Sequence, residues 1–129
     1  MAVSVVRLGS KRQKGEGLRI GTVRRPPRGV PKAEFGKRDF YDVWLPNLAP
    51  SEAVVHEIQH SDCGDAAWKR FERRYRAEMK RPEASRVLDL LAALSEQADF
   101  SVGCYCENEA RCHRSTLRSL LEARGARIR

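Results

Sequence analysis

The chain has 129 residues and a formal net charge of +8, with 41% hydrophobic and 33% charged residues. It contains no apolar run long enough to span a bilayer, and its first residues lack the pattern of a signal peptide. We therefore expect a cytoplasmic protein that folds as a single domain over residues 1–129. In a reducing compartment, its four cysteines favour free thiols, a metal site or plain packing over a disulfide framework.

Three short strands are expected in the first third of the chain, at residues 4–8, 18–23 and 40–45. The second of these alternates apolar residues with small or polar ones, which is typical of a half-buried strand. The segment between the second and third strands, residues 24–32, holds three prolines and a glycine, so regular structure is excluded there. This loop displays Arg24, Arg25 and Arg28.

The remainder of the chain alternates helical patterns with one further strand. A helix is expected at residues 51–60 with Ser51 as its N-cap, a longer one capped by Asp65, and a third that begins at Pro82. The apolar run 100–104 predicts a strand. A last helix, about 112–124, should pack on the sheet through its leucines. Strands interleaved with helices predict a small α/β fold with a mainly parallel sheet flanked by helices.

Residues 104–114 concentrate the reactive side chains of the chain, with three of the four cysteines and one of the three histidines. In open α/β sheets, ligands gather beyond the carboxyl ends of the strands, and a helix N-terminus attracts anions. We expect Arg114 to bind phosphate or carboxylate, and the pKa of Cys112 to be depressed at the helix N-terminus. Glu107 is a candidate for proton transfer and His113 should point toward the sheet.

The same stretch allows a metal site, because Cys104, Cys106, Cys112 and His113 are nitrogen and sulfur ligands within a short segment. Neighbouring residues on a strand or a helix point in different directions, and the spacing differs from that of common zinc sites. Cys104 is expected to pack as a small apolar residue in the strand, protonated and shielded. An anion site with a polarised cysteine is therefore preferred, and no metal ligand is assigned.

His56 and His60 flank a glutamate in a pattern that matches the histidine-containing motif of zinc proteases. On a helix both histidines fall opposite the apolar side formed by Val54 and Ile58, since successive residues turn by about 100°. The longer protease signature also fails, because Cys63 stands where a glycine is required. We therefore expect these histidines to be solvated.

The positive charge of the chain is concentrated near its beginning. Residues 1–38 hold 11 Lys and Arg against 2 Asp and Glu, whereas residues 39–129 hold 14 against 15. This asymmetry is typical of a protein with an anionic partner, although a solvated basic surface without a partner would show it too.

Several segments together resemble the bacterial family called domain of unknown function 488. They are residues 17–29, residues 42–46 with 49–51, the aromatic residues Trp68, Phe71 and Tyr75, and above all Cys106, Glu107, Cys112, His113 and Arg114. The resemblance covers about residues 3–125. It implies an α/β fold with a Rossmann-like sheet and no established activity, and it groups these last five residues into one site without assigning their roles.

The preferred hypothesis is a site for a phosphate-bearing ligand, such as a nucleotide or nucleic acid, between the loop of Arg24, Arg25 and Arg28 and the Cys106–Arg114 turn. If the protein is an enzyme, a thiol-based transfer or hydrolysis is expected. The alternatives are a metal-binding or redox-sensing module that uses Cys106, Cys112 and His113, and a nucleic-acid-binding module without catalysis. The sequence identifies no cofactor, substrate or oligomeric state.

Overall fold

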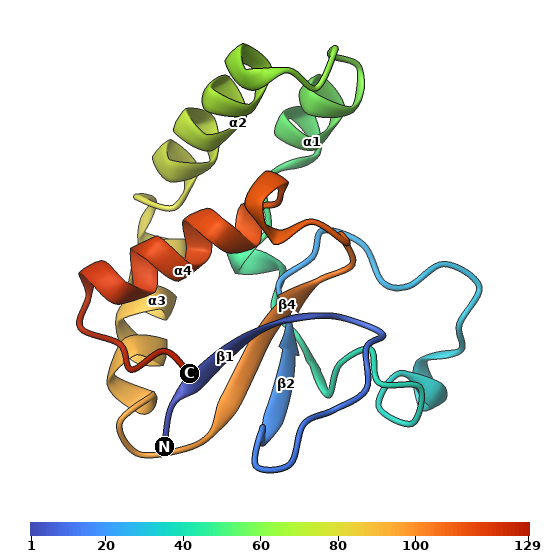
Figure 1. Ribbon diagram of the computed structural model, residues 1–129, viewed down its shortest axis with the longest axis vertical. Helices are drawn as coiled ribbons and strands as arrows, with labels where there is room; N and C mark the ends of the chain where they lie inside the picture. The colour runs from blue at the N-terminus through green and yellow to red at the C-terminus, as the bar shows by residue number, and fades with distance from the viewer.

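A parallel sheet forms the centre of the computed structural model, which describes residues 1–109 and 111–129 (Figure 1). Among these residues the sheet has four strands in the order β1-β4-β2-β3, and every pair is parallel. The strands are β1 (Val3–Arg7), β2 (Leu18–Gly21), β3 (Val43–Trp44) and β4 (Phe100–Cys104). The expected α/β fold with a parallel sheet is confirmed, and β4 lies between β1 and β2.

Three of the α-helices come between β3 and β4 in the chain and one follows β4, and they lie above and beside the sheet in Figure 1. In the described part of the chain the α-helices are α1 (Glu52–Gln59), α2 (Asp65–Glu78), α3 (Pro82–Leu94) and α4 (His113–Ala123). Short 3-10 helices are η1 (Lys32–Glu34), η2 (Pro46–Leu48) and η3 (Glu109–Arg111). None of the helices in the described residues combines the length and the apolar character that a membrane span requires.

The expected helix starts are largely observed. The backbone N–H of Val54 donates to Ser51 Oγ at 3.3 Å, so Ser51 is the N-cap of α1, and Pro82 is the first residue of α3. At α2 the sequence prediction was wrong by one residue. Gly64 is the N-cap and Asp65 is the first helical residue, where its carboxylate faces the positive end of the helix.

The main hydrophobic core joins one face of the sheet to the α-helices. Ile20 and Val102 on adjacent strands pack in the same cluster as residues of α1, α2, α3 and α4. Leu117 and Leu121 of α4 are fully buried in it, and Leu120 is partly buried at its edge. The prediction that the last helix packs through these leucines is therefore confirmed.

The opposite face of the sheet is covered by coil. Gly21 follows Ile20 in β2, so the two residues face opposite sides of the sheet. A Cβ atom at Gly21 would lie 2.3 Å from the ring of Tyr41, which shows how closely the 30–42 segment approaches the strand. Tyr41 packs there with Leu8 and Val23, and Phe35 meets the Tyr41 ring edge-on.

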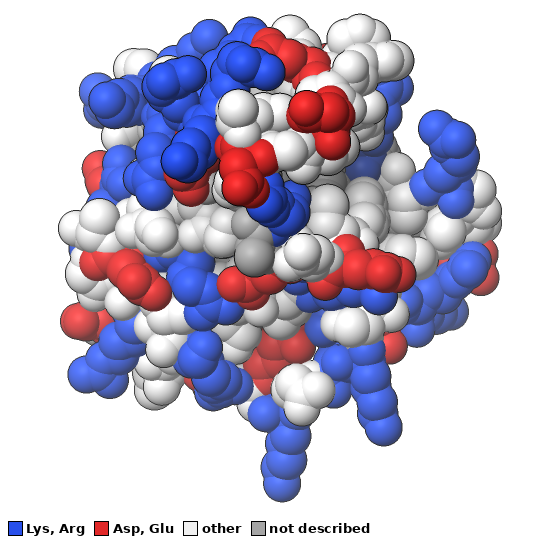
Figure 2. All heavy atoms as spheres, turned by 45° about the horizontal axis from the view of Figure 1, so that its top comes forward, with Lys and Arg blue, Asp and Glu red and all other residues white. Residues whose placement is uncertain are grey.

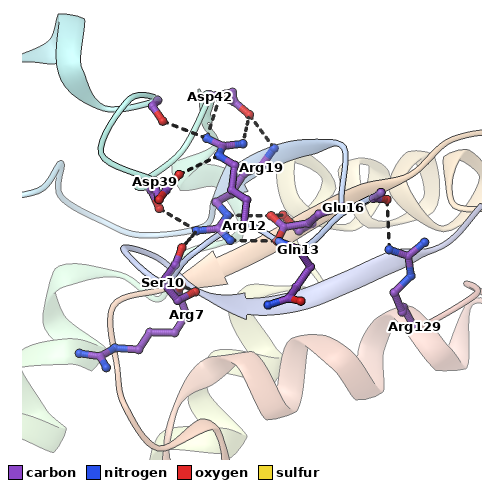
Figure 3. Close-up of polar contacts among 12 residues, drawn as sticks. Arg7, Ser10, Arg12, Gln13, Glu16, Arg19, Asp39, Asp42 and Arg129 are labelled. Carbon is purple, nitrogen blue, oxygen red and sulfur yellow. Dashed lines mark hydrogen bonds and ion pairs between the residues drawn. The ribbon is translucent and has the colours of Figure 1, made fainter.

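A buried ion pair fixes this coil layer to the sheet (Figure 3). Arg19 of β2 is fully buried and donates through Nε and Nη2 to both carboxylate oxygens of Glu16, at 2.7 and 2.9 Å. The Nη1 atom donates to the carbonyls of Ser10 and Asp39, and Ser101 Oγ donates to Glu16. The segment that carries Ser10 and Glu16 is thus anchored to β2 by buried hydrogen bonds.

The two ends of the chain lie side by side (Figure 1). The backbone N–H of Val3 donates to the carbonyl of Arg127 at 2.8 Å, and that of Arg129 donates to the carbonyl of Val3 at 2.8 Å. Val3 and Ile128 consequently form a parallel bridge beside β1.

Candidate functional site

Three cysteines meet at the carboxyl end of β4. The sulfur atoms of Cys104, Cys106 and Cys112 all lie within 4.8 Å of one another. Cys104 Sγ and Cys106 Sγ are 3.6 Å apart. Cys104 and Cys112 are buried, whereas Cys106 is exposed, so the cluster opens to the surface on one side.

The local chain path explains why these thiols converge. Cys104 is the last residue of β4, and Cys106 follows two residues later, so both side chains project to the same side of the strand. The chain then turns through η3 and returns to place Cys112 as the N-cap of α4. The cluster therefore joins the end of the central strand to the start of the last helix.

His113 lies next to the cluster but is not one of its three members. Its Nε2 atom is 2.7 Å from the carbonyl oxygen of Thr22, which can only accept a hydrogen bond, so Nε2 carries the proton. The Nδ1 atom faces Cys112, whose Sγ lies 3.8 Å away. The ring of Tyr75 packs edge-on against the imidazole and fixes its orientation.

Arg114 is buried beside the cysteines, with only 3% of its surface exposed. Its Nη2 atom donates to the carbonyl of Cys106 at 2.5 Å. Its Nε atom is buried and has no hydrogen-bond partner among the described residues, and none of the ion pairs within them involves Arg114. A buried guanidinium without a carboxylate favours negative charge on its neighbours.

The pKa values of the three thiols are shifted in different directions. Hydrogen bonds from Cys104 and then from Cys106 lower the pKa of Cys112, against the effect of burial, and His113 lowers it further. The pKa of Cys104 is raised by its hydrogen bonds to Cys106 and Cys112 and by burial. The hydrogen bond with Cys104 favours the Cys106 thiolate, but the bond to Cys112 and burial outweigh it, so the pKa of Cys106 is raised.

Of the three thiols, Cys112 is therefore the one whose ionisation is favoured, whereas the pKa shifts of Cys104 and Cys106 favour the protonated form. The directions for Cys112 and Cys104 agree with those expected from the sequence. The main cause is the neighbouring thiols rather than the helix N-terminus or Arg114.

Glu107 is directed away from the cysteines. Its side chain is 84% exposed and pairs with Arg7, with Nη2 and Oε1 3.5 Å apart. Among the described residues it is not part of the group of potential metal ligands formed by the cysteines. The structure therefore brings Cys106, Cys112, His113 and Arg114 together and leaves Glu107 outside.

Two of the three arginines in the 24–32 loop bind groups outside the cysteine turn. Arg24 donates to the carbonyls of Pro46, Ala49 and Pro50, and Arg25 pairs with Glu52 at 2.6 Å. The loop backbone does approach the cysteine turn, since Tyr105 Oη donates to the carbonyl of Arg25 at 3.1 Å. Arg28 is exposed.

His56 on α1 and His60, the residue just after this helix, are both exposed, as expected, with ring centroids 4.0 Å apart. Within the described residues no third potential ligand joins them, so the protease-like pattern does not form a metal site of three ligands.

Sequence reasoning missed the participation of Cys104. The signal was present in the two-residue separation of Cys104 and Cys106, which places both thiols on one side of an extended chain. The rule that adjacent residues point in different directions does not apply to two cysteines separated by one residue. The rule does apply to the adjacent residues Cys112 and His113, since His113 faces Thr22 while Cys112 faces the other two thiols.

Comparisons with known proteins give one match. No curated protein and no solved structure matches the chain. The sequence profile of DUF488-N3a, described as the active DUF488-N3 subclade, matches residues 3–125. Since this match spans nearly the whole sequence and agrees with the resemblance noted above, the chain belongs to the DUF488 family, in its N3a subclade.

Proposed function

We propose that Cys104, Cys106 and Cys112 bind one thiophilic divalent metal ion, of which zinc is the first choice, through three sulfur ligands and an open fourth position. The observation that carries this proposal is the approach of the three sulfur atoms to within 4.8 Å of one another. Zinc–sulfur bonds of about 2.3 Å at tetrahedral angles separate bound sulfurs by about 3.8 Å, so small side-chain rotations suffice.

The surroundings of the thiols support this assignment. Binding requires thiolates, and the lowered pKa of Cys112 favours the thiolate form, while the cationic Arg114 lies beside the cysteines outside any ion pair of the described residues. Three bound thiolates outweigh the two charges of the metal, and Arg114 offsets the remaining negative charge. The Nε2–H of His113 bound to Thr22 fixes the ring that supports Cys112, a role typical of residues behind a ligand.

An open fourth position would make this a reactive site rather than a structural one. Structural zinc sites are closed by four protein ligands, whereas catalytic sites have three and bind water or substrate. In the described part of the chain the group contains three potential ligands, and the exposed Cys106 marks the side open to solvent. The description of the matched subclade as active supports chemistry at this position.

Metal analysis of the protein, purified without an affinity tag under reducing conditions, tests the proposal. We expect about one equivalent of zinc per chain, lost in each of Cys104→Ser, Cys106→Ser and Cys112→Ser. Cys63→Ser is the matched control, because Cys63 is exposed and lies outside the cluster. His113→Gln should retain the metal, which separates this ligand set from one that includes the histidine.

A wild-type protein that takes up no zinc or cobalt after reconstitution would contradict the proposal. So would equal metal content in Cys63→Ser and the three cluster variants. In the cobalt-substituted protein, sulfur-to-metal charge-transfer absorption should appear and should weaken with each ligand removed.

A second candidate function is the binding of a phosphate-bearing ligand at the open position. It is favoured by the bond from Tyr105 to the Arg25 carbonyl, which holds the 24–32 loop against the cysteine turn, and by the exposed Arg28 of the same loop. Phosphate or a nucleotide should then shift the visible bands of the cobalt protein, and Arg28→Gln should reduce the shift. Unchanged absorption bands at saturating phosphate and nucleotide would exclude phosphate binding at the open position. They would not contradict the proposed metal site.

A further inference from the structure

The outer face of α2 carries a straight row of basic side chains. Lys69, Arg73 and Arg76 lie on α2, and Lys80 lies two residues beyond its end. Separations of four and three residues place Lys69, Arg73 and Arg76 on one side of α2 over about 10 Å of the axis, and Lys80 follows Arg76 by four residues in the turn after the helix. We call these four residues the basic row; three are exposed and Arg76 is partly exposed.

The buried side of α2 lies opposite. Ala67, Phe71 and Tyr75 face the core, so the basic row cannot turn inward. Figure 1 shows α2 at the top of the molecule with α1 beside it, and Figure 2 shows Lys and Arg side chains gathered at the upper left when the top is turned forward.

The acidic residues of α2 form no ion pair with this row among the described residues. Asp65 pairs with Arg111, Glu72 accepts from Thr116 of α4, and Glu78 accepts from the backbone N–H of Ser51. Each carboxylate is therefore directed toward another element, while Glu72 and Glu78 keep their negative charge because their donors are neutral.

The basic residues next to the row are held by α1. Glu57 pairs with both Arg70 and Arg74, which fixes α1 against α2 and leaves the row to solvent. Among the described residues, none of Arg73, Arg76 and Lys80 belongs to an ion pair, and Lys69 faces only the exposed Asp65.

We propose that the basic row of α2 is a docking surface for the phosphate backbone of a nucleic-acid duplex. Regularly spaced cations on a rigid helix match a line of phosphates, and they supply affinity without reading sequence. A duplex fits better than a single strand, because single-strand binders stack bases on exposed aromatic rings. Here Phe71 and Tyr75 are buried, and Trp68 is stacked on Phe71.

This surface differs from the one expected from the sequence. Charge counting pointed to the first 38 residues, but Arg19 is paired with Glu16, and Arg12 with Asp39 and Asp42. The lysines of that region lie outside the α-helices and have no helical spacing along one face. The proposal is also independent of the cysteine cluster.

The test measures binding of a labelled mixed-sequence DNA duplex by fluorescence anisotropy over a salt series. The variant carries Lys69→Gln, Arg73→Gln, Arg76→Gln and Lys80→Gln. Its control carries Lys11→Gln, Lys14→Gln, Lys32→Gln and Lys37→Gln, which removes the same charge from exposed positions outside the α-helices.

The row variant should bind the duplex more than about tenfold more weakly at low salt, with a log–log salt slope flatter by about 0.9 per lost contact. The control should stay within about threefold of wild type, because its lysines make no ordered set of contacts. If the row variant unfolds at a lower temperature than wild type, the paired variants Lys69→Gln/Arg73→Gln and Arg76→Gln/Lys80→Gln should each give about half of the slope change.

Three results would overturn the proposal. They are equal losses in the row variant and the control, tighter binding of a single strand than of the duplex, and binding of anionic lipid vesicles but not of the duplex.

Discussion

Two arginines are buried among the described residues, and they are neutralised in different ways. Arg19 meets the carboxylate of Glu16 with two hydrogen bonds, whereas Arg114 meets a carbonyl and a group of thiols. A buried cation is costly unless an anion lies beside it. In the first case the anion is permanent at neutral pH, and in the second it depends on the ionisation of cysteine.

Replacing Glu16 by glutamine should destabilise the protein by about 3–5 kcal/mol at pH 7, because Arg19 stays charged and buried without its partner. Burial alone would raise the pKa of Glu16, but hydrogen bonds from Arg19 and Ser101 outweigh it, so the folded-state pKa lies below the ordinary value. The pair therefore contributes its stability above about pH 4 and loses it as the pH falls through the folded-state pKa.

Denaturant melts at several pH values check this prediction. The difference in free energy of unfolding between wild type and Glu16→Gln should narrow below about pH 4. Glu107→Gln is the control, since its pair with Arg7 is exposed and should change stability little at any pH. A pH-independent difference would show that the carboxylate charge of Glu16 is not what stabilises the coil layer.

At the scale of elements, α4 connects the cysteine cluster to the core. Its first turn carries His113 and Arg114 under the cluster, and its later turns bury Leu117 and Leu121. The position of the cluster therefore depends on the packing of this helix against the sheet and α3.

Leu121→Ala should lower the free energy of unfolding by about 2–5 kcal/mol, because it leaves a cavity where a side chain is fully buried. Leu90→Ala on α3 makes the same chemical change at a residue that is 62% exposed, and it should cost much less. Urea denaturation of the two variants makes the comparison, and similar losses in both would place Leu121 outside the core.

Helix and strand positions could be predicted well because they depend on local patterns. Ser51, Pro82 and the leucines of α4 each indicate structure through neighbours in the chain. The coil layer could not be predicted, since Arg19 and Glu16 look like surface residues until Tyr41 and Asp39, far along the chain, cover them. The orientation of Arg24 and Arg25 likewise depends on distant partners in η2 and α1.

For the candidate site, the sequence indicated the correct turn but not all of the residues that come together there. Cys106, Cys112, His113 and Arg114 were grouped, and the structure brings them together. Cys104 was assigned to packing because it ends an apolar strand. Its proximity to Cys112 depends on the return of the chain through η3, which no local pattern encodes.

At the scale of the whole molecule, the proposed metal would link the central strand to the last helix. Chelation under reducing conditions should therefore lower the melting temperature by more than about 5 °C, since metal binding to the folded state adds to its stability. Cys63→Ser should show the same shift and Cys112→Ser should show none. If the melting temperature of the wild-type protein is the same with and without chelator, the thiols bind no metal in the folded protein.

The pairing of Val3 with Ile128 has a consequence for how this domain can be joined to other chains. Both ends leave the fold beside the start of β1, whereas the cysteines lie where the parallel strand β4 finishes. A partner fused at either terminus would therefore emerge on the side remote from the cysteine cluster. A short peptide joining Met1 to Arg129 would close the backbone into a ring, and a circular permutant opened in the exposed 61–64 turn would keep every strand contact intact.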